Sequence, residues 1–263
     1  MTSPPQVLLL DGGVSTHLES NLLDPNHPQR PPFSHRELWS SSLLLTLAGR
    51  DAILKAHRDF LSAGADIIST VTYQAHYMPL PGKEDDTGRL RLDDAEVDNM
   101  LKDGVRLARE AINQYQKENG SSKQAAYVAA SIGSLGGSLA DGSEYTGNFG
   151  LSIEEIESFH TRKLKLLAGE HPDIVAFETI PCLEECEAIL NVLKKQMPGG
   201  FRTERDAPSM PPACWLSFAC SDEEHLNDGS NLRDALALVE RLDPEAKLLQ
   251  ALGVNCCSFK NGA

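Results

Sequence analysis

The chain has 263 residues, of which 41% are hydrophobic and 24% charged, so it is long enough to bury a substantial core. Its 24 Lys and Arg against 38 Asp and Glu give a net charge of -14, which would repel nucleic acid and anionic lipid. The chain shows no signal-peptide pattern, and no apolar stretch approaches the roughly 20 residues that a membrane span needs. We therefore expect neither nucleic acid nor a membrane as partner, a cytoplasmic location, and reduced thiols for the six cysteines.

Short apolar runs alternate with longer segments that have helical spacing, which predicts repeated β-α units and a parallel sheet. Six runs are rich in β-branched or bulky residues, as strands buried on both faces should be. They cover residues 7–10, 67–72, 126–130, 174–177, 215–218 and 248–254. Three stretches rich in proline, glycine or charge are expected to be surface insertions, at residues 24–32, 79–94 and 198–212.

Helical signals stand between these runs. A shared apolar face over residues 53–61 predicts a helix that ends at Gly64, and Ser152 with Glu155 resembles a capping box. Apolar stripes predict further helices after the fourth and fifth strands, and the acidic run at residues 221–224 looks like a helix start. Six β-α units fit either a doubly wound sheet or an unfinished eight-stranded barrel, and periodicity does not choose between them.

In both folds ligands bind where the strands end, so the residues after each run are the candidates for function. The first strand ends in Asp11-Gly12-Gly13, whose glycines let backbone amides approach a carboxylate, although a tight turn capped by Asp has the same pattern. The second runs into Tyr73, which would either line a pocket or cap the core. The glycine-rich segment 134–150 lacks the lysine of a phosphate-binding loop.

The fourth strand ends at Glu178, which should face a cation because an unpaired buried charge costs several kcal/mol. A substrate ammonium and a structural Lys or Arg are both consistent with this position. The sixth strand ends at Cys256-Cys257, and because neighbouring side chains on a strand point to opposite faces, one of the two thiols should face the interior. We expect packing roles for the other four cysteines, and packing or surface positions for His57 and His160.

Taken in order along the chain, seven segments resemble the homocysteine S-methyltransferase family. They are Leu10-Asp11-Gly12-Gly13, Leu38-Trp39-Ser40, Ala63-Gly64-Ala65-Asp66, Thr70-Val71-Thr72-Tyr73-Gln74, Asp141-Gly142-Ser143-Glu144-Tyr145-Thr146-Gly147, Phe177-Glu178-Thr179-Ile180-Pro181 and Gly253-Val254-Asn255-Cys256. Each motif alone is weak, but seven in the correct order make a chance match improbable. The resemblance implies an α/β fold of the TIM barrel type, with about six β-α units present. Residues 1–263 would then be one homocysteine-binding barrel domain that lacks its last two units.

The resemblance also implies zinc-dependent transfer of a methyl group from a sulfonium donor to homocysteine, giving methionine. S-methylmethionine and S-adenosylmethionine are the expected donors, and the residues do not choose between them. The family holds zinc through three cysteine thiolates, of which Cys256 matches one and the other two are absent from this sequence. Because a catalytic zinc normally keeps three protein ligands, we expect this chain alone to be inactive.

By the same resemblance, Asp11, Gly12 and Gly13 would bind the amino-acid end of homocysteine, and Glu178 its ammonium group. Trp39 and Tyr73 would line the pocket and favour a cationic sulfonium through their ring faces. One alternative is a degenerate, non-catalytic barrel that binds an amino acid or a protein partner. Another is a lyase or aldolase, which the lack of a Schiff-base lysine at the predicted strand ends disfavours.

Overall fold

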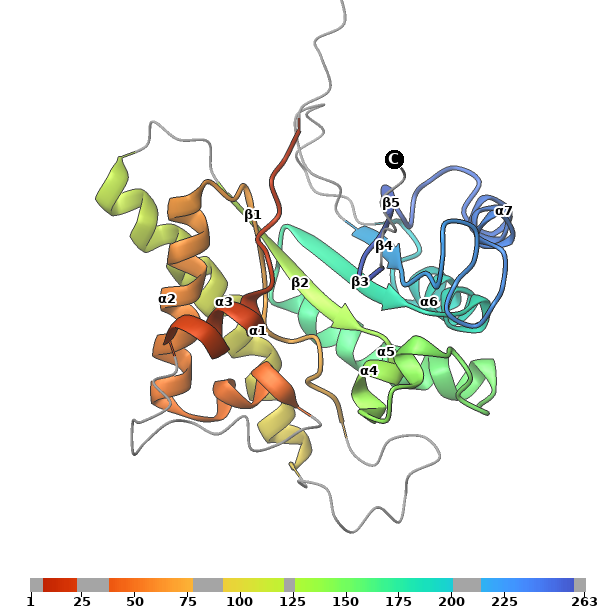
Figure 1. Ribbon diagram of the computed structural model, residues 1–263, viewed down its shortest axis with the longest axis horizontal. Coiled ribbons are helices and arrows are strands. Elements are labelled where there is room, and N and C mark those ends of the chain that lie inside the picture. The colour runs from red at the N-terminus through yellow and green to blue at the C-terminus, as the bar shows by residue number, and fades with distance from the viewer. Residues whose placement is uncertain (1–6, 23–37, 78–91, 121–125, 201–213, 258–263) are drawn as a thin grey trace, which may run out of the picture.

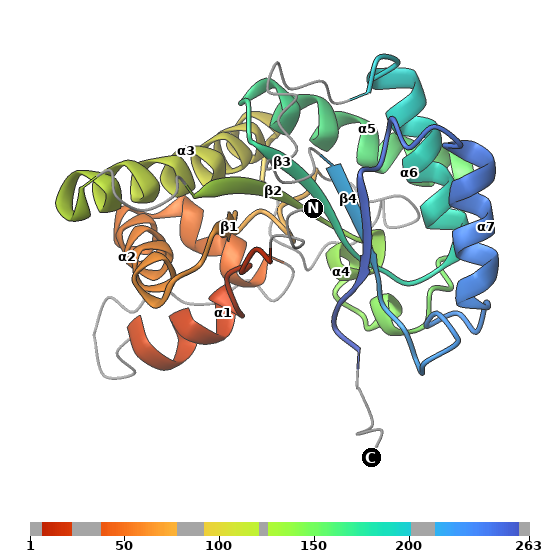
Figure 2. The same cartoon turned by 90° about the horizontal axis from the view of Figure 1, so that it is seen from above.

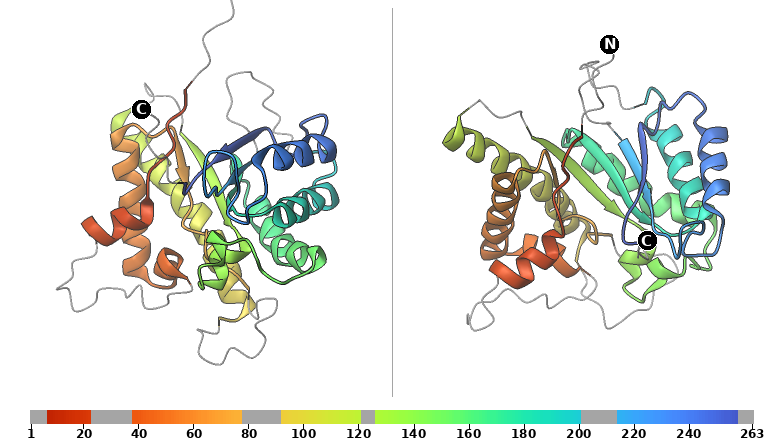
Figure 3. Two further views of the ribbon diagram at one scale, coloured as in Figure 1. Left: turned by 45° about the vertical axis from the view of Figure 1, so that its right-hand side comes forward. Right: turned by 45° about the horizontal axis from the view of Figure 1, so that its top comes forward.

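The computed structural model of the chain describes residues 7–22, 38–77, 92–120, 126–200 and 214–257. At its centre is a sheet of five parallel strands, β1 (Ile67–Ser69), β2 (Tyr127–Gly133), β3 (Ile174–Ile180), β4 (Cys214–Phe218) and β5 (Ala251–Val254). Their order across the sheet is their order in the chain. Leu10 extends this series with a parallel bridge to Ile67 at the β1 edge. Figure 3 shows this N-terminal segment in red and β5 in blue.

A doubly wound sheet reverses its strand order at a switch point, whereas a barrel adds each strand beside the previous one. The unbroken order from Leu10 to β5 is therefore of the barrel type. Within the described part of the chain the sheet does not close on itself, because β5 pairs with β4 and the Leu10 bridge stays at the other edge.

One long helix precedes each strand: α2 (Leu47–Ala63), α3 (Asp94–Asn119), α5 (Ile153–Gly169), α6 (Leu183–Gln196) and α7 (Leu232–Leu242). They form an arc along the outer side of the strands (Figures 1 and 2). Shorter helical segments occupy the loops: α1 (Val14–His17), η1 (Leu18–Leu22), η2 (Trp39–Leu45), α4 (Leu135–Leu139) and η3 (Ser143–Tyr145). No helix in these described ranges is long and apolar enough to span a membrane.

The main core lies between the sheet and the helical arc. Fully buried side chains from both layers meet there, among them Ile53, Leu101, Val128, Phe177, Leu190 and Leu216. The predicted ends of two helices are confirmed, since Gly64 adopts the left-handed conformation after α2 and Ser152 with Glu155 forms a capping box at α5.

Several predicted boundaries were wrong. The first strand reduces to the single bridge at Leu10, and the second ends at Ser69 because the chain turns there. The acidic run at residues 221–224 is not a helix start: the Asp222 carboxylate accepts from the amides of Glu224 and His225, which closes a turn instead. Helix α7 begins at Leu232, after its cap Asn231.

Helix α3 was not predicted from the sequence, although Asp93 and Glu96 form a capping box at its start. The helix has 26 residues, and Val97, Leu101 and Val105 recur on its buried face at helical spacing, so a signal was present. Of the three expected insertions, residues 24–32 lie outside the described ranges, as do most of 79–94 and 198–212.

The capping box of α5 gives a test of this fold. Ser152→Ala removes the side chain that accepts from the Glu155 amide and should lower the free energy of unfolding by about 1 kcal/mol. A urea titration should show a lower midpoint with an unchanged slope. As a control, Ser62→Ala on the exposed face of α2 should change stability by about 0.5 kcal/mol or less. Equal losses in the two variants would contradict the capping role.

Candidate active site at the strand ends

Because all strands run in one direction, their carboxyl ends meet at one edge of the sheet. Asp11 follows the Leu10 bridge, Tyr73 lies in the turn after β1, and Glu178 belongs to the last part of β3. Cys256 follows β5 by two residues. The structure therefore brings to one edge four of the predicted site residues, which come from segments far apart in the sequence.

Asp11 is 8% exposed and sits between the N-terminal segment and β1. Its Oδ2 accepts from the amide of Ser69 at 2.9 Å, and its own amide donates to the carbonyl of Ile67 at 2.9 Å. Burial raises the pKa of Asp11 from 3.8 to about 7, the Ser69 amide opposes this, and the charge of Glu178 adds to it. The two carboxyl groups are therefore close enough to repel each other.

Gly12 and Gly13 follow with exposed backbone and lead into α1. A Cβ at Gly12 would lie 3.2 Å from Cε1 of Phe60, so a side chain there would have to displace the ring. This gives a steric reason for glycine beside Asp11.

Glu178 is partly buried, and its Oε2 accepts from the hydroxyl of Ser131 on β2 at 2.6 Å. Burial raises the pKa of Glu178, while the Ser131 hydrogen bond and the positive charge of Lys163 lower it. A structural lysine therefore acts electrostatically on Glu178, and the binding of a substrate ammonium by Glu178 stays a prediction.

Lys163 reaches this cluster from helix α5 and is 1% exposed. Its Nζ donates to the carbonyl of Tyr73 at 2.8 Å, and the amide of Gly133 donates to the same oxygen at 3.3 Å. Burial lowers the pKa of Lys163 to about 7, and Glu178 acts in the opposite direction. With its amine buried and hydrogen-bonded, Lys163 is poorly placed to attack a carbonyl substrate.

The position of Lys163 in the site was not predicted from the sequence, although a signal was present. Lys163 falls on the buried stripe of α5, in register with Ile156, His160, Leu164 and Leu167. A lysine at such a position has to find a polar partner inside the protein.

The ring of Tyr73 packs against two glycines. A Cβ on Gly133 would lie 2.8 Å from Cδ2 of the ring, and one on Gly137 would lie 2.8 Å from Cε1. Burial raises the pKa of Tyr73 above its usual range, and the side chains of Thr179 and Ser134 lie within hydrogen-bonding reach of its hydroxyl. Tyr73 therefore lies beside the strand-end residues Ser134 and Thr179, and its role as a pocket wall stays a prediction.

The indole hydrogen bond of Trp39 goes to a residue outside this cluster. It is 39% exposed, and its indole N–H donates to Oε1 of Glu19 in η1 at 3.0 Å. This contact joins η2 to η1. The expected pocket-lining role of Trp39 remains a prediction.

At the end of β5, Cys256 and Cys257 point in different directions. Cys256 is exposed, and its Sγ lies 3.8 Å from Oγ1 of Thr179, the residue that follows Glu178. Sγ of Cys257 instead accepts from the amide of Cys220 at 3.0 Å. Cys256 is therefore the thiol beside the end of β3.

Asn255 links the two strand ends. Its Oδ1 accepts from the amide of Thr179 at 2.9 Å, and its Nδ2 donates to the hydroxyl of Thr179 at 2.9 Å. Thr179 and Cys256 both have positive φ, at 63° and 50°. Thr179 lies within β3, where the register against β4 shifts between Phe177 and Ile180, so the strand is irregular at the point where it meets Cys256. The role of Asn255, which lies in one of the family motifs, was not predicted from the sequence.

A metal does not fit the described residues by themselves. Within the ranges that the structure describes, no group of three His, Cys, Asp or Glu side chains lies close enough together to hold an ion. Cys256 is a single suitable thiol, and Asp11 and Glu178 are engaged with Ser69 and Ser131.

His57, His160 and the four cysteines Cys182, Cys186, Cys214 and Cys220 lie in buried positions, which agrees with the packing roles expected for them. His57 is fully buried, its ring nitrogens find no hydrogen-bond partner among the described residues, and burial lowers its pKa to about 4. His160 contacts Glu185 through Nε2 at 2.8 Å, with both side chains fully buried. Four cysteines are buried free thiols: Cys182, Cys186, Cys214 and Cys220.

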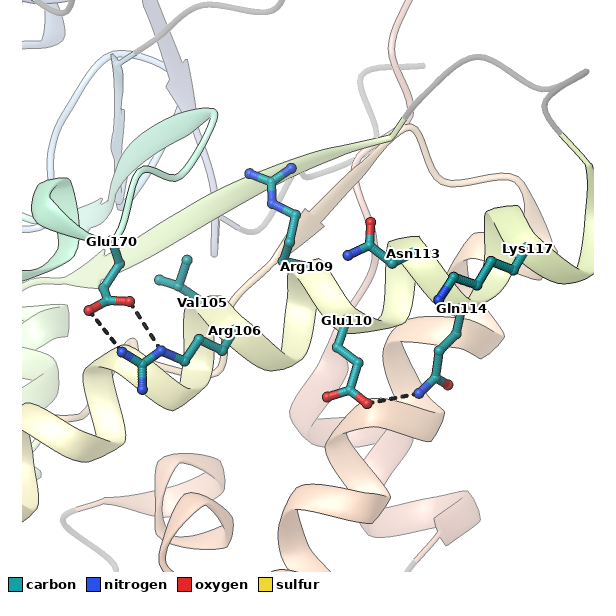
Figure 4. A pocket seen from close by; sticks show the side chains of 8 residues that line it. All are labelled: Val105, Arg106, Arg109, Glu110, Asn113, Gln114, Lys117 and Glu170. Atoms are coloured by element: carbon teal, nitrogen blue, oxygen red, sulfur yellow. Dashed lines mark hydrogen bonds and ion pairs between the residues drawn. The ribbon is translucent and has the colours of Figure 1, made fainter.

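The cavity drawn in Figure 4 is a different feature. It has a volume of about 400 Å³ and lies along helix α3, where Val105, Arg106, Arg109, Glu110, Asn113, Gln114, Lys117 and Glu170 line it. Both arginines have carboxylate partners, Arg106 with Glu170 at 3.2 Å and Arg109 with Asp173 at 2.8 Å. None of the predicted site residues lines this cavity, so we do not assign the active site to it.

Comparison with known proteins agrees with the motifs. Residues 8–262 match the family model described as Homocysteine S-methyltransferase. The chain is 33% identical to "Homocysteine S-methyltransferase 2" of Arabidopsis thaliana, over 94% of the chain and 68% of that protein. It is 34% identical to "Homocysteine S-methyltransferase" of Escherichia coli, over 97% of the chain and 71% of that protein.

A solved structure is similar as well. The metallated form of the homocysteine methyltransferase MmuM from Escherichia coli matches with a TM-score of 0.75 and 31% identity, covering 97% of this chain and 77% of that one. The resemblance inferred from the sequence motifs is confirmed, and so is the α/β fold of the TIM barrel type, with the barrel not closed among the described residues.

The raised pKa of Asp11 predicts a pH-dependent effect on stability. Between pH 3.8 and about 7 the folded state binds a proton at Asp11 that the unfolded chain has released, so stability falls as pH rises through this window. Asp11→Asn removes the titration and keeps an acceptor for the Ser69 amide. Without ligand, the difference in melting temperature between Asp11→Asn and the parent should increase in favour of the variant from pH 5 to pH 8. The increase should be roughly 2–4 °C for each kcal/mol of stability that the parent loses. A difference that stays constant over this range would argue against a buried neutral Asp11.

The packing of Tyr73 on Gly137 gives a second test. Gly137→Ala would place a Cβ 2.8 Å from the ring and should lower the free energy of unfolding by roughly 1–3 kcal/mol. The matched control is Gly169→Ala at the end of α5, where a Cβ meets no atom within 4 Å. Alanine there should be neutral or stabilise by up to about 1 kcal/mol. Urea titrations of both variants measure these changes in the free energy of unfolding. A Gly137→Ala variant as stable as the parent would contradict the close packing.

Proposed function

Since this chain belongs to the homocysteine S-methyltransferase family, and is by that membership an enzyme of methyl transfer, we propose that its strand-end site binds homocysteine for methylation at sulfur. The observation that carries this proposal is the grouping of two carboxyl groups, those of Asp11 and Glu178, where the strands end. Burial raises the pKa of both groups. The ammonium of a bound amino acid would favour their charged forms and would pair with them.

The other parts of homocysteine have candidate partners around these carboxyls. The exposed backbone at Gly12 and Gly13 is available to the substrate carboxylate, and the Tyr73 ring supplies a wall for the carbon chain. Cys256 marks the side of the site where the substrate sulfur would lie. Trp39 is a further candidate for the pocket rim, because it is partly exposed.

The expected reaction is a single displacement. The sulfur of homocysteine, as thiolate, forms a bond to the methyl carbon of a sulfonium donor while the bond from that carbon to the donor sulfur breaks. The products are methionine and a neutral thioether. S-methylmethionine and S-adenosylmethionine are the candidate donors.

Zinc is the cofactor that the sequence resemblance implies, and the similar MmuM structure is described as metallated. When bound, such an ion lowers the pKa of a coordinated thiol. We propose Cys256 as a ligand. Because the described residues do not form a metal site by themselves, the roles given to them are to bind and orient homocysteine.

We further propose that residues 1–263 act as one homocysteine-binding domain in the cytoplasm. The six cysteines are all free, which supports a reducing compartment.

Homocysteine binding tests this function. Calorimetric titration should give a saturable isotherm, and Glu178→Gln should weaken binding by roughly 10–100-fold, the range for a lost hydrogen bond to a charged group. Glu184→Gln on the exposed face of α6 is the control and should bind like the parent. Absence of binding by the parent chain would overturn the proposal.

Measuring turnover distinguishes the proposed enzyme from the alternative of a non-catalytic barrel. Methionine formation from homocysteine should be measured with S-methylmethionine and with S-adenosylmethionine, each with and without added zinc. Turnover with either donor supports the enzyme and identifies its donor. Homocysteine binding without turnover under all four conditions supports the non-catalytic alternative.

A further inference from the structure

Lys163 belongs to the outer helical layer, yet its amine is held at the strand-end site. Nζ donates to the carbonyl of Tyr73 at 2.8 Å, and its charge interacts with that of Glu178. The side chain is 1% exposed, so solvent does not hydrate this ammonium. The hydrogen bond of Lys163 therefore joins helix α5 to the turn after β1. The amide of Gly133, which pairs with Glu178 in the sheet, donates to the same Tyr73 carbonyl, and this places the amine near the end of β3.

The burial of Lys163 is unfavourable unless the charge has a partner. An apolar side chain of similar volume would fill the same space in α5 without the desolvation penalty of an ammonium. One hydrogen bond to a neutral carbonyl compensates this penalty in part. The other group whose charge acts on Lys163 is Glu178, which pairs in the sheet with Gly133, the residue that shares the Tyr73 carbonyl with Lys163. The effect of Lys163 on Glu178 is therefore the physical reason to have a charge here.

The environment of Glu178 shows what this charge does. Asp11 repels it, Ser131 donates one hydrogen bond to it, and Lys163 is the cation acting on it. Without Lys163, two neighbouring carboxyls would share a poorly hydrated site, where a proton on one of them relieves the repulsion. A protonated carboxyl attracts an ammonium far less than a carboxylate does.

We propose that Lys163 is a positioning residue for substrate recognition, which keeps Glu178 available as a carboxylate for the ammonium of an amino-acid substrate and fixes the backbone of Tyr73 beside it. This inference rests on the proposed function. It makes a specific statement about selectivity: the preference for a thiol that carries an ammonium depends on a residue that does not touch the substrate.

The experiment compares two ligands that differ in one group. Homocysteine and 4-sulfanylbutanoic acid share the thiol and the carboxylate, and the second lacks the ammonium. Calorimetric dissociation constants for both should be measured with the parent chain, Lys163→Met, Lys163→Gln and the control Lys165→Met. Lys165 is exposed on the same helix, so its variant removes an equal charge from the surface. Thermal melts establish that each variant is folded.

The parent and the Lys165→Met control should prefer homocysteine by about tenfold or more, as expected when one ligand lacks a charged hydrogen-bonding group. In Lys163→Met this preference should fall to about threefold or less. Lys163→Gln keeps a donor for the Tyr73 carbonyl but no charge, and it should lose the preference in the same way. A purely structural lysine would instead weaken both ligands equally and leave their ratio unchanged, which overturns the inference.

Lys163→Arg provides the conservative rescue and should retain the preference within about threefold of the parent, because the charge remains. If neither neutral variant folds, this variant decides: a folded Lys163→Arg chain without the preference contradicts the inference. Failure of the proposed function has a different signature, since the parent chain itself would then not bind homocysteine.

Discussion

The site depends on one constraint, that charges removed from water must be matched. Asp11, Glu178 and Lys163 come from a loop, a strand and a helix, and each has a polar partner within 2.9 Å in a neighbouring element. Each of these contacts joins two segments of chain, so the need to pair buried polar groups also positions the elements around the site. In the proposed function, the ammonium of a bound amino acid pairs with the carboxyl groups of this cluster.

The topology of the sheet makes this pairing possible. In a sheet whose spatial order follows chain order, every strand delivers its carboxyl end to the same edge. Residues as far apart as Asp11 and Cys256 therefore reach one site. The departures from regular geometry occur at this edge of the sheet, at Thr179 in the register shift near the end of β3 and at Cys256 beyond the end of β5. Asn255 holds these two residues together.

Much of the fold was predictable because strands buried on both faces and amphipathic helices leave strong periodic signals, and the positions of Asp11, Tyr73 and Glu178 followed from the strand ends. Other features depend on tertiary contacts that periodicity does not encode. Alternation of side chains along β5 did not predict which of Cys256 and Cys257 faces the site, because the strand ends at Val254 and φ is positive at Cys256. The role of Lys163 depends on which way α5 faces the sheet.

The sequential strand order also bears on how the molecule is built up. Each strand pairs with a neighbour that the chain has already produced, so β-α units can dock one after another without threading. Asp11 emerges early during synthesis and Cys256 late, with Lys163 and Glu178 between them. The strand-end cluster is thus a property of the finished assembly, and a nascent chain halted after β3 or β4 holds both carboxyls without the Cys256 thiol.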